Sequence, residues 1–459
     1  MTFSNPAPAF LFAIKKIASC VLVTGAAATF CLNSWAAIPI QQWTQASGAK
    51  VYLVESPAIP MLDVQIDFDA GNRRDPAGKA GLASATASVL DRGVAARAGL
   101  AALDENALGE AWADLGAQFG SGASADRMSF SLRTLTEPDL LDKAVALAAR
   151  QIGEPAFPDS VWQRDRQKAV ASLRESYTRP ASVAGRAYSK AVYGSHPYGY
   201  ETTEATLARI SVADMRTFYA STVAACRARI SMVGAVTRAQ ADAIATRLLA
   251  RLPQVPCAGL PALPAVAEVM PLVEAQQTVI PFNAAQAQVL LGQPGYKRSD
   301  PAFFPMLVGN YILGGGGFVS RLANEVREKR GLTYSVSSNF SPGLHAGAFT
   351  VGLQTRPDQV GQALEVTRRV VSDFVEQGPT ELELKAAKDN LIGGFALLID
   401  SNRKLLGNIA NIAWNDLPLD YLDTWTQQVD KVSVADIKAA FAQKLQPAKM
   451  VTIVLGGTP

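Results

Sequence analysis

One short pattern occurs twice in this sequence, far apart, and it constrains the fold more than any other feature. Residues 210–215 read Ile-Ser-Val-Ala-Asp-Met, and residues 432–437 read Val-Ser-Val-Ala-Asp-Ile. Each copy precedes a strand-like segment, at residues 227–234 and 448–456. In both copies a serine stands where a helix N-cap belongs, with an acidic residue one turn later. A duplicated domain is the economical explanation, and convergence of common helix-start chemistry is the alternative.

A proline-rich stretch lies between the two copies and reads as an interdomain linker. Its prolines are Pro253, Pro256, Pro261, Pro264 and Pro271. The predicted organisation is a signal peptide over residues 1–36, an N-terminal domain over 37–252, the linker over 253–282 and a C-terminal domain over 283–459.

Strands and helices come in runs rather than in strict alternation. In residues 62–69 apolar side chains alternate with Asp63, Gln65, Asp67 and Asp69, which predicts a strand with one face in water. Further strands are expected at residues 127–134, 288–292, 333–340 and 347–354, and helices at 81–90, 106–117, 140–151, 160–177, 357–376 and 380–399. This grouping favours an α+β fold over a doubly wound parallel sheet.

The composition narrows the range of functions. The 459 residues are 49% hydrophobic and 18% charged, as in a globular protein. Lys and Arg (43) nearly balance Asp and Glu (40), so nucleic-acid binding has no electrostatic support. His196 and His345 are the only histidines, which limits zinc and acid-base chemistry.

The N-terminus reads as an export signal. Lys15 and Lys16 precede an apolar run over residues 17–32, and cleavage after Ala36 or Ala37 fits the small-residue requirement. An uncleaved membrane anchor is the alternative, although the run is short for a span. We therefore expect a periplasmic or otherwise exported protein with no stable membrane insertion after signal removal.

The cysteines fit an exported chain. Cys20 and Cys31 lie in the predicted signal, which leaves Cys226 and Cys257. In an oxidising compartment these two can form a disulfide, and the sequence leaves open whether they do. So few cysteines and histidines argue against a Cys/His zinc site.

The most specific motif covers residues 313–336. Gly314, Gly315, Gly316 and Gly317 precede Ser320, which can cap a helix, and a strand is expected to begin around residue 334. A phosphate-binding loop is excluded because no Gly-Lys-Ser/Thr follows the glycines.

With His-Pro-Tyr-Gly at residues 196–199 and the Ile-Ser-Val-Ala-Asp segment, this motif resembles the pitrilysin/insulinase family, which includes the mitochondrial processing peptidases. The resemblance runs from about residue 42 to the C-terminus. It implies two homologous α/β sandwich domains that face each other like a clamshell, and active members are zinc peptidases that enclose peptides.

The zinc motif of the family is missing. The resemblance predicts His-x-x-Glu-His directly after Gly-Leu-Ala at residues 81–83, but this chain has Ser84, Ala87 and Ser88 at the three functional positions. Hydroxyls are poor zinc ligands, and alanine cannot act as a general base. We expect no zinc or other cofactor on this chain, a small-residue helix packed on a neighbour, and exposed acids at Asp165 and Glu175, where a third ligand would lie.

The other half of the family site is present. The resemblance assigns substrate and transition-state contacts to an arginine and a tyrosine seven residues apart, which match Arg327 and Tyr334. It also suggests that the four glycines touch the peptide, although a plain turn explains them equally well. The structural alternatives are that Arg327 caps its helix and that Tyr334 fills a strand face. His196 and His345 receive no catalytic role.

Two functions fit this pattern. In the first, the chain is the non-zinc subunit of an exported heteromeric metallopeptidase, inactive alone, and acts on peptides at the zinc site of a homologous His-x-x-Glu-His partner. In the second, it is a catalytically inert peptide-binding or scaffolding protein of the same fold. Hydrolysis through an unrelated site of its own has little support, because no Gly-x-Ser-x-Gly elbow occurs and neither Cys226 nor Cys257 has a histidine neighbour.

Overall fold

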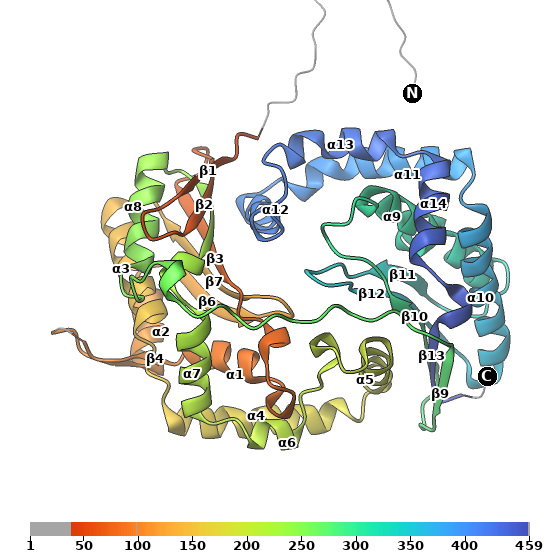
Figure 1. The fold of residues 1–459 in the computed structure, drawn as a ribbon, viewed down its shortest axis with the longest axis horizontal. Coiled ribbons are helices and arrows are strands. Elements are labelled where there is room, and N and C mark those ends of the chain that lie inside the picture. Colours follow the sequence, from red (N-terminus) through yellow and green to blue (C-terminus); the bar gives the residue numbers. More distant parts are fainter. Residues whose placement is uncertain (1–37, 98, 458–459) are drawn as a thin grey trace, which may run out of the picture. The chain divides into compact units, whose positions relative to one another are not determined.

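The structure is a computed structural model that describes residues 38–97 and 99–457. Residues 38–457 form one compact unit built on two β-sheets (Figure 1). The predicted α+β fold of two similar domains is confirmed, and each predicted helix and strand overlaps an observed one. The predicted signal peptide lies outside the described residues.

The first sheet has six strands in the order β1-β2-β8-β3-β7-β6, and the second has five in the order β11-β12-β10-β13-β9. The strands are β1 Gln41–Thr44, β2 Lys50–Glu55, β3 Met61–Phe68, β6 Gln118–Ala123, β7 Met128–Leu135, β8 Arg229–Gly234, β9 Gln276–Ile280, β10 Ala287–Pro294, β11 Val336–Phe340, β12 Ala348–Thr355 and β13 Val451–Leu455, with a small ribbon of β4 Gly93–Val94 and β5 Leu103–Asp104.

The helices fall into two corresponding sets. In the N-terminal half they are α1 Leu82–Leu90, α2 Glu105–Asp114, α3 Pro138–Gly153, α4 Asp159–Ser176, α5 Pro180–Tyr193, α6 Glu204–Ala208, α7 Val212–Thr222 and α8 Arg238–Leu249. In the C-terminal half they are α9 Phe303–Asn310, α10 Val360–Gln377, α11 Glu381–Gly394, α12 Asn402–Trp414, α13 Tyr421–Lys431 and α14 Val434–Lys444.

The two sheets share one topology. In the first, β2 is parallel to β8, and β8, β3, β7 and β6 follow in antiparallel pairs. In the second, β9, β13, β10, β12 and β11 repeat that order and those directions. Both predicted capping boxes are confirmed, Ser211 with Asp214 at α7 and Ser433 with Asp436 at α14. Shared topology and shared caps support a duplication over convergence.

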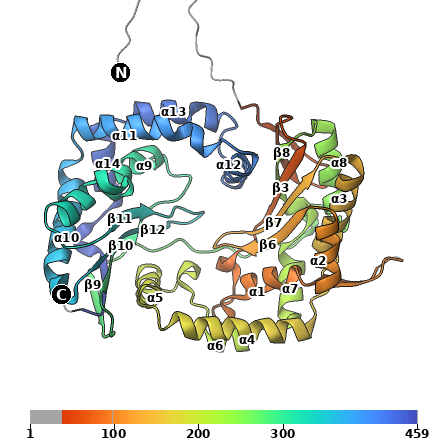
Figure 2. The same ribbon diagram turned by 180° about the vertical axis from the view of Figure 1, so that it is seen from behind.

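Each sheet is covered on its inner face by a helix of the opposite half. α12 packs on β3 and β8 of the first sheet, whereas α5 packs on β10 and β13 of the second (Figure 2). Tyr52 and Val233 of the first sheet share one apolar cluster with Ile409 of α12. Ala184 of α5 likewise clusters with Ile453 of β13. The two halves are therefore interlocked by an exchange of helices.

Polar anchors hold the exchanged helices. The last carbonyls of α12 accept hydrogen bonds from the opposite half: Ala413 and Trp414 from Arg229, and Ala410 from Arg127 (3.4 Å). Cations at a helix C-terminus also interact favourably with its dipole. On the other side the Tyr188 hydroxyl of α5 donates to a backbone carbonyl of β12 at 2.5 Å.

One prediction about β3 is wrong in an informative way. Asp63 and Asp67 were expected to face water, but they are 4% and 0% exposed, because α12 covers this face. Each pairs with an arginine of β7 or of the loop before it, Asp63 with Arg133 and Asp67 with Arg127, both at 3.1 Å. Pairing offsets the cost of burying the two carboxylates.

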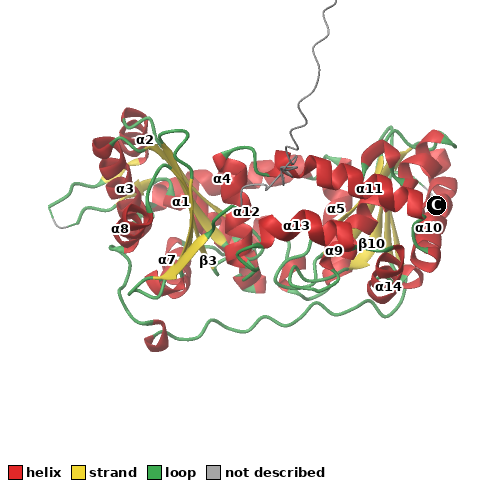
Figure 3. Cartoon of the chain, turned by 90° about the horizontal axis from the view of Figure 1, so that it is seen from above, coloured by secondary structure: helices red, strands yellow, loops and turns green. Residues whose placement is uncertain are grey.

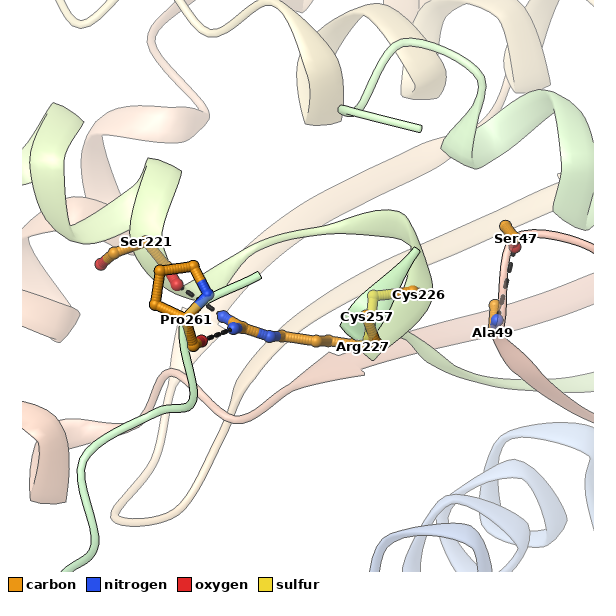
Figure 4. The surroundings of a disulfide bond; sticks show 7 residues. All are labelled: Ser47, Ala49, Ser221, Cys226, Arg227, Cys257 and Pro261. Carbon is orange, nitrogen blue, oxygen red and sulfur yellow. Dashed lines mark hydrogen bonds between the residues drawn. A yellow bond between two sulfur atoms is a disulfide. The ribbon is translucent and has the colours of Figure 1, made fainter. Parts of the chain in front are cut away.

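The segment between the two halves is mostly irregular and runs along one side of the molecule (Figure 3). A disulfide joins Cys226, just before β8, to Cys257 in this segment (Figure 4). Beside it the Arg227 guanidinium donates to the carbonyls of Ser221 (2.6 Å) and Pro261 (2.5 Å). The strand β9 (Gln276–Ile280) lies within the last residues of the predicted linker, 253–282. The domain boundaries given from the sequence remain predictions.

Replacing Asp67 by alanine should destabilise the protein by about 2–4 kcal/mol, because it leaves Arg127 unpaired under α12. The control is Asp358→Ala: Asp358 and its partner Arg356 are about two-thirds exposed, so the loss should stay below about 1 kcal/mol. Denaturant unfolding followed by circular dichroism measures both. If both variants lose equally little unfolding free energy, the buried Asp67–Arg127 pair does not stabilise the packing of α12 on the first sheet.

Removing the disulfide through Cys226→Ser should cost up to about 3–4 kcal/mol, the chain-entropy value for its 31-residue separation. Peptide mapping of the unreduced protein should recover the Cys226 and Cys257 peptides as one linked species. The reduced wild type should match the double serine variant in stability. Free thiols at both positions in protein isolated without reductant would contradict the bond.

Candidate functional site

The glycine motif forms a compact connection between α9 and β11. Ser320 organises it: its Oγ donates to the Gly317 carbonyl at 2.6 Å and accepts from the Ala323 amide at 3.4 Å. The predicted capping role of Ser320 is thus confirmed. The connection consists of a π-helical turn (Tyr311–Gly315), a 3-10 turn (Gly317–Val319) and a second π-helical segment (Ala323–Glu328).

The four glycines form a packed turn rather than an open loop. Added Cβ atoms at Gly314, Gly315 and Gly316 would lie 2.4 to 2.8 Å from neighbouring atoms, too close for any side chain. Gly317 has open space but a φ of +64°, which favours glycine. The plain-turn interpretation accounts for all four, and their contact with peptide stays a prediction.

The structure brings Arg327 and Tyr334 together. The Arg327 guanidinium carbon lies 5.2 Å from the centre of the Tyr334 ring and 4.5 Å from that of Phe318. Both aromatic side chains are exposed, Tyr334 by 79% and Phe318 by 73%. The single acidic neighbour of Arg327 within the described residues is Glu328, at 3.5 Å from Nε. A cation and a phenol therefore stand side by side on the surface.

The strand-face alternative for Tyr334 is not observed, and Arg327 lies in the last turn of its helical segment without donating to a carbonyl there. Tyr334 lies in a bend before β11, which begins at Val336 rather than at the predicted position, so its ring does not fill a strand face. The side chain that binds a carbonyl of the second π-helical segment is Arg330, which donates to Glu325 at 2.7 Å. Within the described residues, the Tyr334 hydroxyl has no hydrogen-bond partner, and the Arg327 guanidinium pairs only with the Glu328 carboxylate, at 3.5 Å. Their polar groups are available to a ligand.

The degenerate zinc positions lie on α1, as the resemblance implies. Ser84 and Ser88 share the exposed face of the helix, whereas Ala87 is buried. The Ser84 hydroxyl donates to Asn72 at 2.9 Å, and the Ser88 hydroxyl donates back to the Ala85 carbonyl at 2.8 Å. Two hydrogen-bonded hydroxyls without an imidazole or a carboxylate do not fit zinc.

The helix expected to carry a third ligand is α4, and the prediction for Asp165 is wrong. Its side chain is 11% exposed and pairs with Arg164 at 2.9 Å and with Arg92 at 3.3 Å. Glu175 is 70% exposed, as expected. Two guanidiniums beside Asp165 repel a cation. Over residues 38–97 and 99–457, no group of three His, Cys, Asp or Glu side chains could hold a metal ion.

The two histidines, which the sequence left without a shared role, meet at the junction of the halves. Their ring centres are 5.1 Å apart, and both are more than nine-tenths buried. His345 Nδ1 lies 3.1 Å from a carboxylate oxygen of Glu268. His196 Nδ1 accepts from the Tyr198 amide, and the Tyr198 hydroxyl donates to Asp126 at 2.6 Å. Nothing in the sequence linked residues so far apart.

Comparison with known proteins identifies the family. Residues 209–391 match the family described as Peptidase M16 inactive domain. The crystal structure of a peptidase M16 inactive domain from Pseudomonas fluorescens superposes with a TM-score of 0.85 at 34% identity, over 92% of this chain and 98% of that one. The chain belongs to the M16 peptidase family. M16 is the pitrilysin/insulinase family that the sequence motifs indicated.

Other M16 relatives differ in what they are called. A non-peptidase homolog, YmxG, from Helicobacter pylori is 24% identical over 87% of this chain and 90% of its own length. An uncharacterized zinc protease from Streptomyces coelicolor is 36% identical, but the match spans 34% of this chain and 33% of that protein.

No helix among the described residues has the length and apolar character needed to span a membrane.

The histidine junction predicts a pH dependence. Burial, and secondarily His345, hold the pKa of His196 below its ordinary value of 6.5. The unfolded chain therefore binds a proton at this residue more readily, and the contribution of His196 to stability falls as the pH drops below 6.5. Burial raises the pKa of Asp75 to about 6, which acts in the opposite direction.

An NMR titration separates the two effects, because the chain has only two histidines. His196 should titrate below 6.5, and its pKa should rise in His345→Gln, because His345 is one of the groups that lower it. A His196 that titrates at or above 6.5 in the wild type would contradict the buried junction.

Proposed function

We propose that this M16 chain is the non-zinc subunit of an exported heteromeric metallopeptidase. It supplies Arg327 and Tyr334 to peptide hydrolysis at the zinc site of a homologous partner that carries His-x-x-Glu-His. The observation that supports the proposal is a contrast within one chain. Arg327 lies beside the exposed Tyr334, whereas the positions of the family's zinc motif hold Ser84, Ala87 and Ser88.

The chemistry of the pair suits this role. A tyrosine hydroxyl can donate to the oxyanion that develops when a peptide carbonyl is attacked, and one such donor is worth about 10²–10³ in rate. A guanidinium stays charged at any working pH and can donate to a second carbonyl of the peptide. The exposed position of Tyr334 fits a site completed by another surface.

An exported location is part of the proposal and rests on the N-terminal sequence and on the disulfide. Lys15 and Lys16 followed by the apolar run are typical of a secretory signal. A bond between Cys226 and Cys257 persists in oxidising compartments and is rare in the cytosol.

Mixing the purified chain with a homologous His-x-x-Glu-His chain should produce peptide hydrolysis that neither shows alone. Tyr334→Phe removes one hydroxyl and should lower kcat of the mixture about 10²-fold or more. Arg327→Lys keeps the charge but loses the planar donor set, and it should lower kcat/KM. Steady-state kinetics on a fluorogenic peptide measures both variants.

The matched control is Tyr177→Phe, which changes another exposed tyrosine, on the segment between α4 and α5. It should leave the rate unchanged. If Tyr334→Phe hydrolyses peptide as fast as the wild-type mixture, the catalytic assignment is wrong. Peptide binding with no turnover in any mixture would favour the inert scaffolding protein instead.

A further inference from the structure

Phe318 is an exposed phenylalanine whose position the apolar core does not explain. Its side chain is 73% exposed, so it gains little from burial. In the structure it lies over the Arg327 guanidinium, 4.5 Å from ring centre to Cζ.

The contact with Phe318 limits the positions that the Arg327 guanidinium can take. A guanidinium close to the face of an aromatic ring is attracted by the ring electrostatically, and the contact uses none of its N–H donors as conventional hydrogen bonds. The Tyr334 ring lies on the same guanidinium at 5.2 Å. Two rings thus restrict a long, flexible side chain that has a single ionic neighbour, Glu328, within the described residues.

The turn that carries Phe318 is itself fixed. Ser320 is fully buried, and both its hydroxyl (2.6 Å) and its amide (3.1 Å) donate to the Gly317 carbonyl, which closes the turn around Phe318. The positive φ of Gly317 begins this turn, and the packed glycines before it leave little room for movement. The ring is therefore carried by a hydrogen-bonded turn.

We propose that Phe318 is a positioning residue for Arg327: its ring holds the guanidinium beside the Tyr334 hydroxyl, with the N–H donors turned towards a bound peptide. The inference rests on the proposed function for the identity of the ligand, a peptide backbone carbonyl. The inference adds Phe318 to the residues that serve the proposed function, and it explains the glycine turn as the segment that holds the Phe318 ring in place.

The first experiment needs no partner chain. Arginine Nε–Hε NMR relaxation of the full chain, with the Arg327 signal assigned from Arg327→Lys, reports the order of this side chain. Phe318→Leu keeps an apolar side chain but removes the ring, and it should make the Arg327 signal clearly more mobile. Phe318→Tyr keeps a ring and should restore the order. An Arg327 signal equally ordered in Phe318→Leu would overturn the proposal.

The second experiment uses the two-chain mixture and a fluorogenic peptide. Phe318→Leu should lower kcat/KM about 2- to 5-fold, the range for an exposed cation–π contact, and Phe318→Tyr should recover most of the loss. In an Arg327→Gln background, Phe318→Leu should have no further effect, because it acts through Arg327. Leu382→Ala, at a leucine that is 78% exposed on α11, is the control and should match the wild type.

The outcomes separate this inference from the proposed function. If Tyr334→Phe and Arg327→Gln lower the rate but Phe318→Leu does not, Phe318 has no positioning role and the proposed function stands. If none of the three lowers the rate, the proposed function fails, and the relaxation measurement alone then decides whether the ring orders Arg327. Additive losses in the double variant would show that Phe318 acts independently of Arg327.

Discussion

The reciprocal exchange of α5 and α12 is the constraint on which the rest of the structure depends. A sheet with helices on one face leaves its other face in water, and here each half covers the inner face of the other. Arg229 and Arg127 bind the last carbonyls of α12, and Tyr188 fastens α5. Separating the halves would expose the two apolar clusters that they share and break the hydrogen bonds from Arg229 and Arg127 to α12.

Within this fold, we propose, the chain keeps the substrate-contacting part of a peptidase site, Arg327 and Tyr334, and lacks the metal-binding part. The positions on α1 that hold metal ligands in active relatives carry hydroxyls satisfied by Asn72 and by the helix itself. Asp165 is tied to two arginines. The Tyr334 hydroxyl, in contrast, has no hydrogen-bond partner among the described residues, and Arg327 makes one ion pair there, with Glu328 at 3.5 Å. This combination favours a subunit that contributes to a site over one that has lost all function.

The sequence alone predicted the local elements well, because their signals are local. Capping boxes, alternation in strands and the glycine motif each depend on a few neighbouring residues. It failed where a distant segment changes the environment. Asp63 and Asp67 have the pattern of a wet strand face and are buried because α12 covers them. The stacking of Phe318 on Arg327 and the meeting of His196 with His345 depend on the tertiary fold in the same way.

The most direct test of the central claim is the zinc content and peptidase activity of the full chain purified by itself. Metal analysis by plasma mass spectrometry, alongside an assay on unfolded peptides, measures both on one sample. The account predicts no stoichiometric zinc and no turnover, because Ser84, Ala87 and Ser88 cannot hold the metal or activate water. One zinc per chain together with hydrolysis by the isolated protein would contradict it.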